Sequence, residues 1–171
     1  MSVAGWLLGF VLPLCATPGA QGIAVPVAPA SLRAIVRPGS PNHALAAPAG
    51  FSPVPDVVTP AYAVPPAALL AAIDAVALSQ PRVFALAAVA DAPLRRDYMA
   101  RSAVFNFPDL VAVEVLPQGD GAGLVLWSRS VYGRSDLGAN RRRLAGWLAA
   151  LDARLALAAS APSPSSSRSA P

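Results

Sequence analysis

The distribution of proline limits how this chain can fold. Eleven of its 19 prolines lie between Thr17 and Pro66, in a sequence of 171 residues. Proline has no backbone N–H and moves the preceding residue away from helical conformation. We therefore expect residues 21–63 to form an extended, proline-rich arm. The expected folded unit is residues 64–158, a length suited to a single domain.

The two ends of the chain differ from this unit in composition. Gly5 to Ala16 is an apolar run, which is short for a membrane-spanning helix, so residues 1–20 are expected to be a signal-like or membrane-anchor leader. Leu12 to Cys15 faintly resembles a lipidation box, although Leu14 stands where a small residue is usual. The leader predicts an exported or envelope-associated protein. No basic side chain precedes the apolar run, so a mis-assigned start, and with it a cytoplasmic protein, is the alternative. Residues 159–171 are rich in Ser, Pro and Ala and are expected to be disordered.

Between these ends, the hydrophobic pattern predicts one helix, four strands and a second helix. Pro65 and Pro66 suit a helix start, and apolar residues at helical spacing run to a stop at Gln80-Pro81. Successive strands without intervening helices favour antiparallel pairing. The predicted fold class is α+β, a four-stranded, mainly antiparallel sheet covered by two helices. The predicted elements are helix 66–79, strands at about 83–89, 96–107, 110–116 and 123–131, and helix 136–157.

The basic charge is concentrated in one part of this unit. All 13 basic residues are Arg, against nine acidic residues, and five of the arginines fall between Arg129 and Arg143. Nucleic-acid-binding proteins usually spread basic residues along a face and interleave aromatic residues with them. Tyr132 is the only aromatic residue in this cluster, so no nucleic-acid partner is expected.

The cluster covers a strand end, a turn at Gly133 and the start of the last predicted helix, for which Ser135 or Asp136 would serve as N-cap. In this helix Leu137, Leu144, Leu148, Leu151 and Leu155 share one face, with Trp147 at its edge. By the helical period, Asn140 and Arg141 lie within about 60° of the centre of this face, so we expect both to face the sheet. Arg142 and Arg143 are expected to point outward.

Two interpretations of this corner are open. In the first, it is a polar network that only stabilises the fold of a structural or protein-partner-binding domain. In the second, it binds an anionic small molecule, a lipid headgroup or a membrane surface, because helix N-termini and arginines attract anions. The candidate ligand-binding residues are Arg129, Ser130, Arg134, Asp136, Asn140 and Arg141, with Arg101 and Asp109 as secondary candidates.

Two segments of the chain resemble a known family. The run from Ser128 to Arg143 contains Ser-Asp-Leu-Gly-Ala-Asn-Arg and resembles the signature of the domain of unknown function 1499 family of bacteria and plants. Arg101-Ser102, followed by Phe107-Pro108-Asp109, is similar to a second family motif, and Ser40-Pro41-Asn42 resembles the start of the family's domain.

The resemblance covers about residues 38–155. The family often has a Cys after its Pro-Asn pair and a second acid after its first, where His43-Ala44 and Leu110 stand here. These departures argue against roles that need a thiol or paired carboxylates. The family has no assigned activity, and many of its members carry a signal or membrane segment, which agrees with export.

Standard catalytic constellations are not apparent. The chain has one Cys, in the leader, and one His, His43, in the arm. Cysteine and serine nucleophiles both need a nearby base, and a metal site needs clustered ligands. We therefore expect no catalytic residues, no cofactor and no metal, and a non-enzymatic domain. An enzyme of unknown class is the third hypothesis.

Overall fold

The computed structural model describes residues 28, 29 and 31–160 of the chain. The predicted leader and residues 161–171 of the predicted tail lie outside this range. The elements, in chain order, are η1 (Leu32–Ala34), β1 (His43–Pro48), β2 (Val57–Thr59), α2 (Pro66–Ser79), β3 (Val83–Ala85), β4 (Arg95–Arg101), β5 (Pro108–Gln118), β6 (Gly121–Ser130) and α3 (Ala139–Ser160). The tail prediction is wrong for Ala159 and Ser160, which belong to α3.

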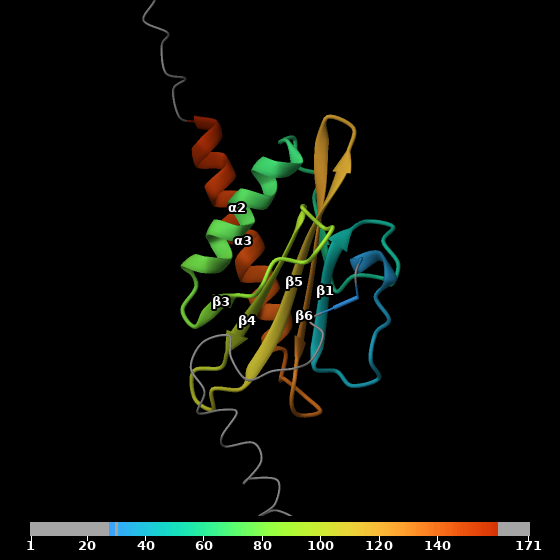
Figure 1. The fold of residues 1–171 in the computed structure, drawn as a ribbon, viewed down its shortest axis with the longest axis vertical. Helices are drawn as coiled ribbons and strands as arrows, with labels where there is room; N and C mark the ends of the chain where they lie inside the picture. The colour runs from blue at the N-terminus through green and yellow to red at the C-terminus, as the bar shows by residue number, and fades with distance from the viewer. Residues whose placement is uncertain (1–27, 30, 161–171) are drawn as a thin grey trace, which may run out of the picture.

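The strands form one six-stranded mixed sheet in the order β2-β1-β6-β5-β4-β3, with α2 and α3 side by side on one face (Figure 1). The α+β class is confirmed, and the prediction of four strands is wrong. β1 and β2 arise from residues expected to form an extended arm, and they pair in parallel with each other. β1 is short and its central residues are buried, so it lacks the polar alternation that reveals a half-buried strand.

The helical face of the sheet carries the larger core. α2 spans Pro66–Ser79 as predicted, and it buries Leu69, Leu70, Ile73 and Val76. Trp147 of α3 packs edge-on against Tyr98 of β4, with ring centroids 5.7 Å apart. Both helices therefore dock through apolar side chains spaced at the helical period.

The second face of the sheet carries a smaller core that the N-terminal segment covers. Leu32 and Ile35 pack there with Leu45, Val125 and Trp127. The Glu114 carboxylate of β5 accepts a hydrogen bond from the Leu32 N–H at 2.6 Å, which attaches η1 to the sheet. This segment is therefore part of the packed structure, which extends N-terminal to residue 64, the predicted start of the folded unit.

Several predicted boundaries differ from the structure. The strand predicted at 83–89 ends at Ala85, and those predicted at 110–116 and 123–131 run from Pro108 to Gln118 and from Gly121 to Ser130. Two further differences lie beside residues that adopt positive φ. α3 begins at Ala139, not at residue 136, since Leu137 and Gly138 have φ of 52° and 79°. β4 ends at Arg101 instead of continuing to residue 107, and Asn106 in the following loop has a φ of 55°. Left-handed conformations are incompatible with a continuing helix or strand.

Candidate functional site

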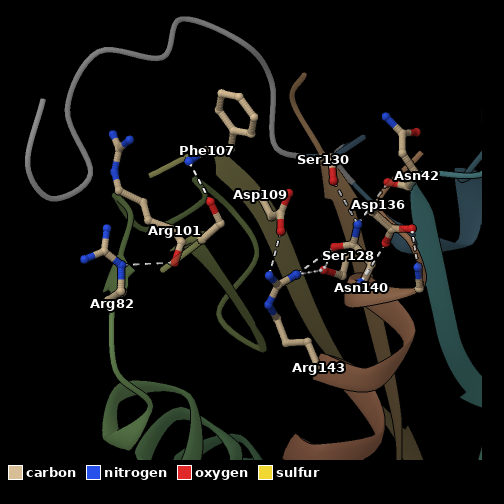
Figure 2. A network of polar contacts seen from close by, with 12 residues as sticks. Asn42, Arg82, Arg101, Phe107, Asp109, Ser128, Ser130, Asp136, Asn140 and Arg143 are labelled. Atoms are coloured by element: carbon tan, nitrogen blue, oxygen red, sulfur yellow. Dashed lines mark hydrogen bonds and ion pairs between the residues drawn. The ribbon is translucent and has the colours of Figure 1, made fainter. Parts of the chain in front are cut away.

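The start of α3 meets the ends of β1, β5 and β6 in a buried polar cluster, here called the Asn140 network (Figure 2). Its residues are Asn42, Asp109, Ser128, Ser130, Asp136, Asn140 and Arg143. The Asn140 side chain is fully buried at its centre. Its amide nitrogen donates to the Asn42 carbonyl at 3.0 Å and to the Ser130 hydroxyl at 3.1 Å. Its Oδ1 accepts from the Ser128 hydroxyl at 2.5 Å and from Arg143 at 2.7 Å. The Asn140 amide therefore uses both donors and both lone pairs.

Asp136 stabilises the turn that leads into α3. Its carboxylate accepts hydrogen bonds from the Gly138 N–H at 2.9 Å and the Asn140 N–H at 2.7 Å. Asp136 thus binds an N–H in the first turn of α3, although it lies three residues before Ala139 and so is not at the N-cap position that was predicted for it. Partial burial opposes the charged form of this group. The hydrogen bonds from Asn140 and Gly138 outweigh that effect and hold the pKa of Asp136 below its usual value. The Ser-Asp-Leu-Gly segment is thus a turn that fixes where the helix begins.

The arginine in the network is Arg143, not Arg141. Arg143 donates to Asp109 at 2.6 Å and to the Ser128 hydroxyl at 3.0 Å, and its side chain is 16% exposed. The prediction that Arg141 faces inward and Arg143 outward is wrong, since Arg141 is exposed.

The geometry of α3 explains this error. Leu137, which was counted in the apolar face, lies before the helix, whereas Trp147 is 2% exposed and sits within that face. The buried face is rotated by roughly 30° toward Arg143 as a result. On that side β5 supplies the Asp109 carboxylate, which pairs with the arginine.

Two other predicted site residues lie apart from the network. Arg129 alternates with Ser128 and Ser130 along β6, so it belongs to the opposite face of the sheet. There it lines a pocket of about 440 Å³ together with Trp127, Arg37 and Val36. Burial lowers the pKa of the Arg129 guanidinium. Arg134 is exposed on the loop that joins β6 to α3. The structure therefore brings together Ser130, Asp136, Asn140 and the secondary candidate Asp109, but not Arg129, Arg134 and Arg141.

Asn42 is a member of the network that the sequence analysis did not include among the site residues. Besides accepting from Asn140, its carbonyl accepts from the Ser130 N–H at 2.9 Å, and its side chain donates to the Gly133 carbonyl at 2.7 Å. The sequence signal for Asn42 was the resemblance of Ser40-Pro41-Asn42 to the start of the family's domain. The partners of Asn42 lie about 90 positions further along the chain, and no local pattern predicts them.

The loop between β4 and β5 lies at the same end of the sheet as the network (Figures 1 and 2). The Ser102 hydroxyl accepts from the Phe107 N–H at 2.9 Å, and Arg101 donates to the Asn106 carbonyl at 3.1 Å. Arg82, which precedes β3, donates to the Asn106 side chain. Arg101 thus holds this loop against the end of β4. The loop presents the exposed side chains of Val104 and Phe105 to solvent.

The described residues were also searched for metal-ligand clusters and for membrane-spanning helices. Among residues 28, 29 and 31–160, no group of three or more His, Cys, Asp or Glu side chains could hold a metal ion. Within the same residues, no helix is both long and apolar enough to span a membrane.

The chain was compared with protein families and with curated proteins. No curated protein matches this chain. A family model described as "Protein of unknown function (DUF1499)" matches residues 36–151, a span that includes every strand, α2 and all members of the Asn140 network. The chain belongs to the DUF1499 family.

Proposed function

We propose that this protein is a non-enzymatic, envelope-associated domain that binds phosphate-type anions through exposed arginines around the Asn140 network. The network itself serves as the scaffold. The shared chemistry of the ligand is a phosphate group, carried either by a lipid headgroup or by a small molecule.

One observation carries this proposal: four exposed arginines lie on the segments that meet at one end of the sheet, one just before β3 and three on the β6–α3 loop and the first turn of α3. This exposed arginine group consists of Arg82, Arg134, Arg141 and Arg142. Asp109 and Asp136 are the carboxylates at this end, and both are committed to contacts within the network. Guanidinium groups bind phosphate through paired N–H donors, so a cluster of them favours an anionic ligand.

The contacts of the network support a scaffolding role and weigh against direct ligand binding by it. Asp109 neutralises Arg143, and the Asn140 amide has partners for all its donors and lone pairs. A ligand at this position would have to break buried hydrogen bonds, each of which is costly to leave unmade. The fold-stabilising interpretation of the corner therefore fits the inner residues, and the anion-binding interpretation fits the outer arginines.

The test is an NMR titration of the full chain with inorganic pyrophosphate at low ionic strength, following the arginine Nε–H signals. The signals of Arg134, Arg141 and Arg142 are expected to shift, and those of Arg154 near the other end of α3 are not. The Arg134→Gln/Arg141→Gln variant should weaken binding about tenfold, whereas the control Arg154→Gln should leave it unchanged. The absence of shifts, or equal weakening by the control, would contradict the proposal.

A further inference from the structure

Four exposed apolar side chains lie at the same end of the sheet as the arginines. Val104, Phe105 and Leu137 are 81%, 66% and 85% exposed, and Phe107 is 38% exposed. Three belong to the β4–β5 loop and one to the β6–α3 loop. Together they are called the apolar tip.

The two loops of the apolar tip are held together and are internally braced. The Phe105 and Phe107 rings stack with centroids 5.5 Å apart, and Phe107 lies 6.5 Å from Tyr132 of the other loop. Two hydrogen bonds join Ser102 and Phe107: the Ser102 N–H donates to the Phe107 carbonyl at 2.9 Å, and the Phe107 N–H donates to the Ser102 hydroxyl at 2.9 Å. The exposed side chains are thus displayed by a loop that its own hydrogen bonds hold in one conformation, which lowers the entropy lost on binding.

We infer that the apolar tip inserts into the interfacial region of an anionic lipid bilayer while the exposed arginine group contacts the headgroups. This inference rests on the proposed function, and it identifies the phosphate groups that the arginines bind as those of lipid headgroups in a membrane. Binding at a membrane interface is strongest where cations flank apolar side chains. The free energy gained by burying the apolar side chains adds to that gained when the cations meet anionic headgroups.

Charge and shape both favour a bilayer over a folded partner. The tip is formed by two protruding loops rather than a groove, so it suits a deformable apolar phase. The charge around it is positive: Arg134, Arg141 and Arg142 lie on the same loop and helix start as Leu137. The anionic leaflet supplies the complementary charge, and its acyl boundary supplies the apolar phase that the tip lacks in water.

The first experiment is co-sedimentation of the full chain with vesicles of phosphatidylglycerol and phosphatidylcholine, compared with vesicles of phosphatidylcholine alone. We expect at least tenfold stronger partition into the anionic vesicles. Phe105→Ser should weaken that partition about tenfold, because a phenyl ring loses its burial. Leu157→Ser is the matched control, since Leu157 is 72% exposed and lies about 27 Å further along α3 from Ala139. Every variant carries the same leader, so its contribution is constant.

The second experiment reports insertion directly. Phe105→Trp is placed in vesicles with brominated acyl chains, and its fluorescence should be quenched relative to the wild type. The control Leu157→Trp should show no added quenching.

Each outcome decides a different claim. If Phe105→Ser partitions into anionic vesicles as strongly as wild type, and if the fluorescence of Phe105→Trp is not quenched, the apolar tip does not insert. The binding to vesicles would then be driven by charge alone. Pyrophosphate binding without any vesicle partition would overturn the bilayer inference while the proposed function stands. Loss of vesicle partition in Leu157→Ser to the same extent as in Phe105→Ser would also overturn it.

Discussion

The Asn140 network and the apolar tip lie at one end of the same sheet, yet they satisfy opposite physical requirements. In the network, polar side chains are buried and bonded to one another, from the fully buried Asn140 to the Arg143–Asp109 ion pair. In the tip, apolar side chains such as Leu137 and Phe105 are left in water. Buried polar groups with complete partners specify a structure, whereas exposed apolar groups mark a surface for something else to cover.

The difference separates two roles for neighbouring residues. Arg141 and Arg143 are two positions apart in α3, but only Arg143 reaches a carboxylate and a buried hydroxyl. Substitutions in the network should therefore change stability. Substitutions of the exposed arginine group and of the apolar tip should change binding.

The largest effect on stability is expected for Asn140→Ala. This change leaves the Ser128 hydroxyl, the Asn42 carbonyl and Arg143 without a central partner. The free energy of unfolding should fall by about 3 kcal/mol, because buried polar groups lose their hydrogen bonds. Urea denaturation measures this, with the exposed Arg142→Ala as the control, expected within about 0.5 kcal/mol of wild type. A loss below about 1 kcal/mol for Asn140→Ala would argue that the network is not a scaffold.

A slightly smaller loss is expected for Arg143→Ala, about 2 kcal/mol, since Asp109 would keep its charge in a buried site. The matched change two residues away, Arg141→Ala, should have an effect below about 0.5 kcal/mol. A double-mutant cycle with Asp109→Ala should give a coupling energy of about 1–2 kcal/mol. Additive effects in this cycle would show that the ion pair contributes nothing to folding.

Asp136 gives a smaller, pH-dependent effect. Its carboxylate has a lowered pKa in the folded state because it accepts the Asn140 and Gly138 N–H groups. Its contribution is complete above its ordinary pKa near 3.8 and is lost as the pH falls through the lower folded value. Asp136→Asn should cost about 1 kcal/mol at pH 7, as a weakened cap does. Between about pH 5 and pH 2.5, the free energy of unfolding of Asp136→Asn should fall less than that of wild type, because the variant lacks this carboxylate. Denaturation curves at several pH values measure both. Parallel curves would contradict this role.

The smallest effect on stability is expected for Phe105→Ser. The ring is 66% exposed, so its removal should change the unfolding free energy by less than about 0.5 kcal/mol. Thermal unfolding in the absence of lipid checks this. A large loss would mean that the ring supports the fold, and the tip would then not be a free surface.

Local patterns predicted some of this architecture well. The apolar spacing of Leu69, Ile73 and Val76 predicted α2 to the residue. Asp136 binds an N–H in the first turn of α3, but the predicted N-cap position was wrong, because the helix begins at Ala139. The antiparallel pairing of β5 with β6 across the Gly119-Asp120 turn also agrees with the pairing expected for successive strands.

Long-range contacts were the part that local patterns could not supply. β1 was missed because its buried residues show no alternation, and its partners in β6 lie 80 to 86 positions away. Arg143 was placed outward because the predicted helical face included Leu137 and had Trp147 only at its edge, and because the position of Asp109 across the sheet was unknown. Arg129 was assigned to the corner by sequence proximity, although strand alternation turns it to the other face. The exposed Phe105 was assigned to a strand that ends four residues earlier.

The most direct test compares the vesicle affinity and the stability of two single variants, Arg141→Gln and Arg143→Lys. Arg143→Lys keeps the charge but loses the forked contacts to Asp109, Ser128 and Asn140, so it should lower stability and leave partition into phosphatidylglycerol vesicles unchanged. Arg141→Gln should leave stability unchanged and weaken that partition about fivefold. The reverse result, with vesicle affinity lost in Arg143→Lys and retained in Arg141→Gln, would place ligand binding in the network and contradict its role as a scaffold.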